Sequence, residues 1–97
     1  MRRYSLIAVS QPEVIFKVDP RYSDEALKAG LSGTVMLWIV VDTEGHARNI
    51  HVLKSLGMGL DEKAIEAVRQ WKFEPATKDG KPVAVKVAVE VSFHLYK

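Results

Sequence analysis

The sequence contains no cysteine among its 97 residues. Disulfide bonds, thiolate metal sites and thiol nucleophiles are therefore excluded. The apolar run at residues 6–9, near the N-terminus, is four residues long. A signal-peptide core needs roughly seven apolar residues and a membrane helix roughly 20. We therefore expect the chain as given to be soluble, with any anchor of the native protein in a part outside this sequence.

An excess of charge of one sign is also lacking. The 14 lysines and arginines are scattered among 12 aspartates and glutamates, so the net charge is only +2. A nucleic-acid-binding domain needs basic residues gathered on one face, and we expect no such partner. The apolar share of 47% and the charged share of 27% are ordinary for one soluble globular domain of this length.

No group of residues has the spacing of a catalytic site. The three histidines, His46, His51 and His94, lack the i, i+4 helical spacing of a zinc pair. None of the serines lies in a nucleophile-elbow motif. A metal site built from two strands stays open, but solvent-facing strand histidines are the simpler interpretation. We expect no enzyme, no cofactor and no metal, and a metal-dependent enzyme using the histidines ranks last among the hypotheses.

The most informative stretch is the C-terminal one, where every odd position of residues 83–95 is apolar and the even positions are small or polar. This period of two predicts a strand with one face on a core. At about 3.4 Å per residue the strand would be about 40 Å long. Where such a strand lies at a sheet edge, it offers unpaired N–H and C=O groups to another chain.

The rest of the chain predicts the elements that cover this strand. We expect a short strand at 14–18, a helix at 23–30, a strand hairpin at 33–41 and 47–55, a helix at 60–70 and an Asp-Gly turn at 79–80. Ser23 and Asp61 are the predicted N-caps, and Gly30 is the predicted left-handed residue after the first helix. The order predicts an α+β fold of two layers, in which a small antiparallel sheet of about three main strands plus a short N-terminal strand packs with one face on two helices.

The even positions of the strand at 33–41 predict a second candidate interface. Met36, Trp38 and Val40 would make the face away from the helices apolar as well. Such a stripe usually marks a partner surface, a dimer contact or cover by a terminal segment. Residues 6–9 are the candidate cover. A single exposed tryptophan without consequence is the alternative.

Over residues 12–95 the sequence resembles the TonB C-terminal domain family. The motifs that carry the resemblance are Asp19-Pro20-Arg21-Tyr22, Gly30, Gly33, Leu60-Asp61, Ala64, Trp71, Phe73-Glu74-Pro75-Ala76 and Asp79-Gly80-Lys81-Pro82. Two positions depart from the family pattern: Ser23 stands where the family usually has proline, and Asp19 stands where a well-known member has glutamine. Ser23 changes only how the first helix starts, because serine caps a helix as well as proline begins one. We divide the chain into residues 1–11, a leader or extra strand, and residues 12–97, the family-like domain.

The resemblance implies a periplasmic energy-transducing domain, anchored to the inner membrane in the full-length protein. Its implied partners are the TonB box of an outer-membrane receptor and, through a region outside this sequence, an inner-membrane motor complex driven by the proton gradient. The box would add as a strand beside the last strand, a mode known as β-augmentation. The residues implied in partner binding are Asp19, Pro20, Arg21, Tyr22, Lys86, Val87, Ala88, Val89, Glu90, Val91, Ser92, Phe93 and His94. The alternative is a homodimeric structural or signalling scaffold, in which the last strands of two copies pair.

Overall fold

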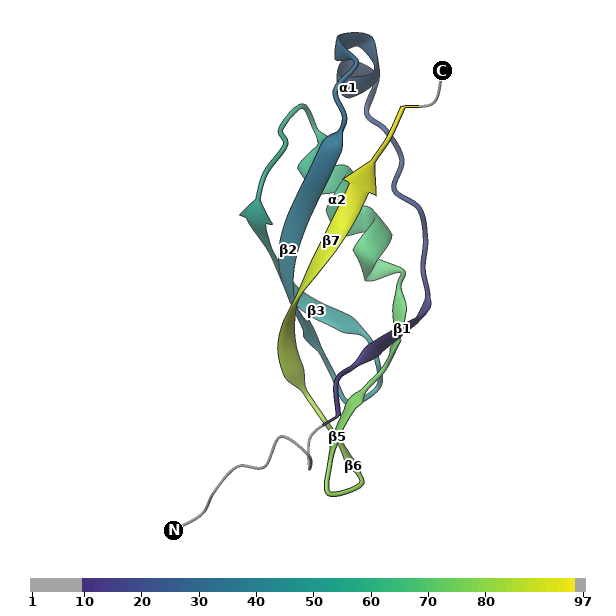
Figure 1. The fold of residues 1–97 in the computed structure, drawn as a ribbon, viewed down its shortest axis with the longest axis vertical. Coiled ribbons are helices and arrows are strands. Elements are labelled where there is room, and N and C mark those ends of the chain that lie inside the picture. The colour runs from purple at the N-terminus through teal and green to yellow at the C-terminus, as the bar shows by residue number, and fades with distance from the viewer. Residues whose placement is uncertain (1–9, 96–97) are drawn as a thin grey trace.

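The computed structural model describes residues 10–95 and has the α+β architecture that the sequence predicts (Figure 1). Its elements in chain order are β1 (Glu13–Phe16), α1 (Asp24–Ala29), β2 (Gly33–Val41), β3 (Ala47–Lys54), α2 (Leu60–Arg69), β4 (Lys72–Glu74), β5 (Ala76–Lys78), β6 (Lys81–Val83) and β7 (Val85–Phe93). Within these residues no helix is long and apolar enough to cross a membrane. The predicted cover at residues 6–9 lies outside the described part of the chain.

The central sheet is antiparallel and has the strand order β3-β2-β7. β2 pairs with β7 in an unbroken register from Gly33 opposite Phe93 to Val41 opposite Val85. Two smaller sheets lie outside it, one of β1 with β4 and one of β5 with β6. The predicted short N-terminal strand therefore exists, but it pairs with the segment that follows α2 and not with the central sheet.

The core lies between the central sheet and α2, which runs behind the sheet in Figure 1. Fully buried side chains alternate along β2 as predicted, and α2 contributes Leu60, Ala64 and Val68 to the same cluster. Burial of each large aliphatic side chain of this kind stabilises a fold by about 1.5–3 kcal/mol. α1 lies at one end of the sheet and closes the core there with Ala26. The sequence predicts that both helices pack on one face of the sheet. In the structure α2 covers that face and α1 covers its end.

The ends of α1 follow the sequence prediction. The Ser23 side chain accepts a hydrogen bond from the N–H of Ala26, and Gly30 adopts a left-handed conformation with a φ of 68°. The Ser23 hydroxyl also donates to the carbonyl of Met58 over 2.6 Å. One capping residue therefore satisfies a helix N–H group and also links α1 to the loop before α2.

The predicted cap of α2 is wrong. The N-cap residue is Gly59, which has no side chain to accept a bond. Asp61 lies inside the helix and instead accepts hydrogen bonds from the Ser55 hydroxyl and the Leu56 N–H. Partial burial raises the pKa of Asp61, but these bonds and one from Gly57 outweigh it and lower the pKa overall. The carboxylate fixes the preceding loop, a role that its place near the helix start does not reveal.

The predicted single strand over residues 83–95 is also wrong. It is interrupted at Ala84: β6 ends at Val83 and pairs with β5, whereas β7 begins at Val85 and pairs with β2. The tight turn at Asp79 and Gly80, where both φ angles are positive as predicted for an Asp-Gly turn, returns β6 along β5. Nine residues of β7 remain, so the strand is about 30 Å long.

Candidate peptide-binding edge

β7 forms one edge of the central sheet. β2 lies on one side of it, and no other strand of residues 10–95 pairs with its opposite side. In an antiparallel pair, every second residue directs both its N–H and its C=O away from the neighbour. The exposed side chains of Lys86, Ala88, Glu90 and Ser92 alternate with half-buried or buried valines and Phe93. The edge thus has backbone groups free for a further strand, while its apolar face is fixed on the core.

The segment of residues 18–22, which we call the strap, runs beside the second half of β7 on the way from β1 to α1 (Figure 1). A hollow of about 250 Å³ separates the two, lined by Asp19, Pro20, Tyr22, Ser92, Phe93 and His94. A second hollow of about 190 Å³ lies beside it, with Lys17 and Trp71, strap residues 18–20, and Glu90, Val91, Ser92 and His94 in its lining. Of the two predicted sets of partner-binding residues, Asp19, Pro20 and Tyr22 of the strap thus lie near the C-terminal end of β7 and His94, whereas Arg21 and residues 86–89 line neither hollow.

The strap is attached to the core at both ends. At one end, the Trp71 side chain donates its Nε1–H to the carbonyl of Val18 over 3.0 Å. At the other end, the Tyr22 hydroxyl donates to the Leu31 carbonyl over 2.8 Å, and its ring packs edge-to-face on Phe93 with centroids 5.5 Å apart. Within the described part of the chain, residues 19–21 make no hydrogen bond or ion pair between these attachments.

Sequence reasoning missed Val18 and Trp71 as positioning residues of this site. The analysis of the sequence assigned Trp71 to the core, and its side chain is indeed buried. Its indole N–H, however, also holds the start of the strap through the carbonyl of Val18. No sequence signal indicates this bond, because its partner is a backbone carbonyl 53 residues away. Lys17 adds to the attachment, with its Nζ 5.2 Å from the Trp71 ring centroid.

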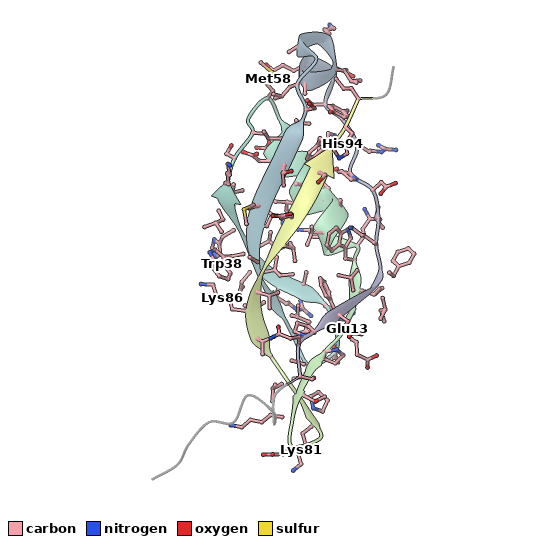
Figure 2. The ribbon with its side chains drawn as sticks, in the orientation of Figure 1. Glu13, Trp38, Met58, Lys81, Lys86 and His94 are labelled. Atoms are coloured by element: carbon pink, nitrogen blue, oxygen red, sulfur yellow. The ribbon has the colours of Figure 1, made fainter. Side chains whose placement is uncertain are left out.

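The second candidate interface is more covered than the sequence predicts. Met36, Trp38 and Val40 lie on the outer face of the sheet, and all three are half-buried. Lys86 on β7 places its Nζ 5.1 Å from the Trp38 ring centroid, and Figure 2 shows the two side chains next to each other. Trp38 also faces His51 and Ala88 on the neighbouring strands. The stripe is therefore half-buried and, apart from Ala88, flanked by polar side chains, and its role as an interface stays a prediction.

The β2–β3 turn contains the one group of described residues that could approach a cation. Ligand atoms of Asp42, Glu44 and His46 lie within 4.8 Å of one another. Both Asp42 oxygens are already engaged, Oδ1 by the N–H groups of Glu44 and His46 and Oδ2 by Arg48. The hydrogen bond from Arg48 and then that from His46 lower the pKa of Asp42 from 3.8 to about 2. These contacts give the aspartate a structural role in the turn.

Comparisons with known proteins identify the family of this chain. Residues 18–95 match the family described as Gram-negative bacterial TonB protein C-terminal. Protein TonB of Vibrio cholerae is 41% identical over 91 residues, which are 92% of this chain and 37% of that protein. Protein TonB of Xanthomonas campestris is 40% identical over 77 residues, or 78% of this chain and 34% of that protein.

A solved structure extends the comparison to the fold. The solution NMR structure of the Pseudomonas aeruginosa TonB CTD matches with a TM-score of 0.72 and 27% identity, over 91% of this chain and 90% of that one. The chain spans about a third of the length of the curated relatives named above. On the family match, the identities and the shared fold, the chain belongs to the TonB C-terminal domain family.

Proposed function

We propose that this domain is the receptor-binding end of a TonB-like energy transducer. It binds the TonB box of an outer-membrane receptor as an added strand on β7 and passes on force from an inner-membrane complex driven by the proton gradient. The full-length protein would be anchored in the inner membrane, with this domain in the periplasm. The observation that carries the proposal is the unpaired β7 edge beside the strap. The function involves no catalysis and no cofactor.

Affinity comes mainly from the backbone of β7. An extended peptide aligned with the unpaired side of this strand pairs with the outward N–H and C=O groups at every second residue. Because these groups are the same for any sequence, one edge can serve receptors whose boxes differ. Each such hydrogen bond contributes about 0.5–1.5 kcal/mol.

Side chains around the edge set the preference among peptides. Lys86 and Glu90 are exposed on the outer face of β7 and offer opposite charges to a bound peptide. Across the hollow, Asp19 is exposed on the strap. A peptide strand in this space lies between charged groups from both sides, so charged positions in the box determine which receptors bind best.

The position of β7 also suits the transmission of force. The strand is held by a register of nine residue pairs with β2, and β2 itself is the middle strand of the sheet. Val91 and Phe93 anchor its inner face in the core. A pull on a paired peptide is shared among several backbone bonds and enters the domain through its most strongly held strand pair.

The test is calorimetry with a receptor TonB-box peptide and two N-methylated versions of it. Methylation of alternate amides that face β7 removes donors while it keeps every side chain. Methylation of the amides in between changes the same number of groups on the other side. We expect the first version to lose at least tenfold in affinity and the second to bind nearly as well as the parent. Equal binding of both versions would contradict strand addition.

The alternative function is a homodimeric scaffold in which the β7 edges of two copies pair. The observation that favours it is the same unpaired edge, since an open edge accepts a second copy as well as a peptide. Sedimentation velocity over a wide concentration range, without and with saturating TonB-box peptide, separates the two functions, because the peptide would dissociate only a dimer that pairs through β7. A monomer mass that does not change with concentration would count against the scaffold.

A further inference from the structure

β1 is the least covered strand of the described chain. It pairs with β4 on one side only, and no strand of residues 10–95 lies on its other side. Three consecutive apolar side chains on it are exposed, Val14 by 43%, Ile15 by 64% and Phe16 by 55%. Single exposed apolar residues are common, but three in a row on an open edge favour association with another strand.

The pairing of β1 with β4 leaves two features unexplained. The register shifts between Val14 and Phe16, so that Ile15 has no partner on β4 although it is the most exposed of the three. Glu13 lies directly opposite Glu74, and like charges in opposite positions of a strand pair are destabilising. A partner of β1 that covers Ile15 and places a cation opposite Glu13 would remove both the exposure of Ile15 and the uncompensated negative charge.

A second copy of the same segment, Glu13-Val14-Ile15-Phe16-Lys17, has the properties required of this partner. In an antiparallel pair of two copies centred on Ile15, the two Ile15 side chains lie opposite each other. Val14 then faces Phe16 of the second copy, and Glu13 faces Lys17 of the second copy. Opposite charges and an aromatic beside a β-branched residue are favourable cross-strand pairs. A slip by one or two residues in either direction loses both ion pairs.

We propose that the domain forms a two-fold homodimer through antiparallel pairing of β1 with β1 of a second copy. The product is a four-stranded sheet in the order β4, β1, β1 of the second copy, β4 of the second copy. Such an interface is isologous and closes on itself. Lys17, whose Nζ lies 5.2 Å from the Trp71 ring centroid in the single chain, turns outward on its flexible side chain to reach Glu13 of the second copy.

This dimer keeps the pairing of β7 with β2, because β1 and β7 belong to different sheets (Glu13 marks β1 in Figure 2), although Lys17 also lines the hollow beside the end of β7. The interface is short, so the association is weak and depends on concentration. One dimer would present two β7 edges at once, which raises the apparent affinity for clustered peptides. The inference does not rest on the proposed peptide binding, since it concerns another edge.

The first test is a cysteine reporter at the centre of the proposed pairing. The two-fold axis places the Cα atoms at position 15 about 4.5–5.5 Å apart, within the range of a disulfide bond. The chain has no cysteine of its own, so Ile15→Cys gives a single reporter. Leu27→Cys, on α1 and 49% exposed, controls for random collisions. Under mild oxidation we expect dimers of Ile15→Cys at several times the rate of Leu27→Cys, and equal rates would overturn the proposal.

The second test uses charge reversal and sedimentation velocity. Lys17→Glu or Glu13→Lys alone is expected to weaken the dimer by roughly tenfold, because both symmetric ion pairs become repulsive. The double variant Glu13→Lys with Lys17→Glu restores it. Circular dichroism confirms that each variant is folded. A single reversal without effect on the mass, or a wild-type chain that stays monomeric at millimolar concentration, would overturn the proposal.

Discussion

The two edge strands of the central sheet, β7 and β3, differ in how regular they are and in how firmly their side chains are buried. β7 keeps a continuous register with β2, and its inward side chains are half-buried or buried. β3 pairs with β2 in a register that shifts twice, and most of its side chains are exposed. Asn49 on β3 also has a positive φ of 49°. One edge is regular and anchored, and the other is irregular and poorly anchored.

This difference teaches which edge can accept a peptide. Bulges twist an edge strand and interrupt the row of outward N–H and C=O groups, and charged side chains protect an edge in the same way. β3 has two shifts in register. Exposed charged side chains occur on both edges, Arg48 and Lys54 on β3 and Lys86 and Glu90 on β7, so the register shifts carry the difference. β7 has no register shift with its neighbour. Within the central sheet, the two shifts therefore make β3 the less regular edge for a further strand and β7 the more regular one.

The largest expected effect concerns how firmly each edge is anchored. Phe93→Ala in β7 removes a side chain that is 1% exposed, and we expect it to cost about 3–5 kcal/mol of unfolding free energy. Val52→Ala in β3 removes one that is 40% exposed, and we expect about 1 kcal/mol or less. Urea denaturation of both variants measures the contrast. Equal losses would mean that the two edges are anchored alike.

A second prediction replaces an edge amide by proline. Successive N–H groups of β7 point alternately towards β2 and away from it. Of the two variants Ala88→Pro and Val89→Pro, one therefore removes an N–H group that points away from β2, and we call it the outward variant. The other removes a hydrogen bond to β2. The outward variant is expected to stay folded and to lose roughly two- to tenfold in peptide affinity per missing bond. Leu53→Pro, at an unpaired position of β3, is the control and should leave peptide affinity unchanged. Calorimetry provides the affinities, and circular dichroism provides the fold.

A third prediction tests the strap. Tyr22→Phe keeps the ring that packs on Phe93 but removes the hydrogen bond to the Leu31 carbonyl. We expect a loss of about 0.5–1.5 kcal/mol in unfolding free energy, together with larger amide shifts in residues 19–21 than in β3. Thermal unfolding and an amide spectrum measure the two effects. Shifts spread evenly over both edges would show that the tyrosine does not act on the strap in particular.

The smallest expected effect concerns the turn that joins β2 to β3. Because the Arg48 hydrogen bond lowers the pKa of Asp42 to about 2 in the folded chain, the aspartate stabilises the fold fully above pH 3.8. This contribution is lost as the pH falls through about 2. Asp42→Asn should therefore show a weaker decline in stability between pH 5 and pH 2 than the wild type. Denaturation midpoints across this range test it, and parallel curves would assign the acid sensitivity to other groups.

The sequence predicts those features that depend on neighbouring residues. Alternation along β2 and β7 predicts which side chains are buried, because strand geometry imposes a period of two. Ser23 and Gly30 act at the ends of α1 as their types indicate. The shifts in β3 and the break at Ala84 depend on which strands pair in space. The bond from Trp71 to Val18 joins distant parts of the chain, so periodicity could not reveal it.

The most direct test of the central claim is a backbone amide NMR titration of the domain with a receptor TonB-box peptide. The account predicts shifts concentrated in β7 and residues 18–22, with β3 unaffected as an internal control. Shifts concentrated in β3, or none in β7 at saturating peptide, would contradict the claim that the regular edge is the peptide-binding one.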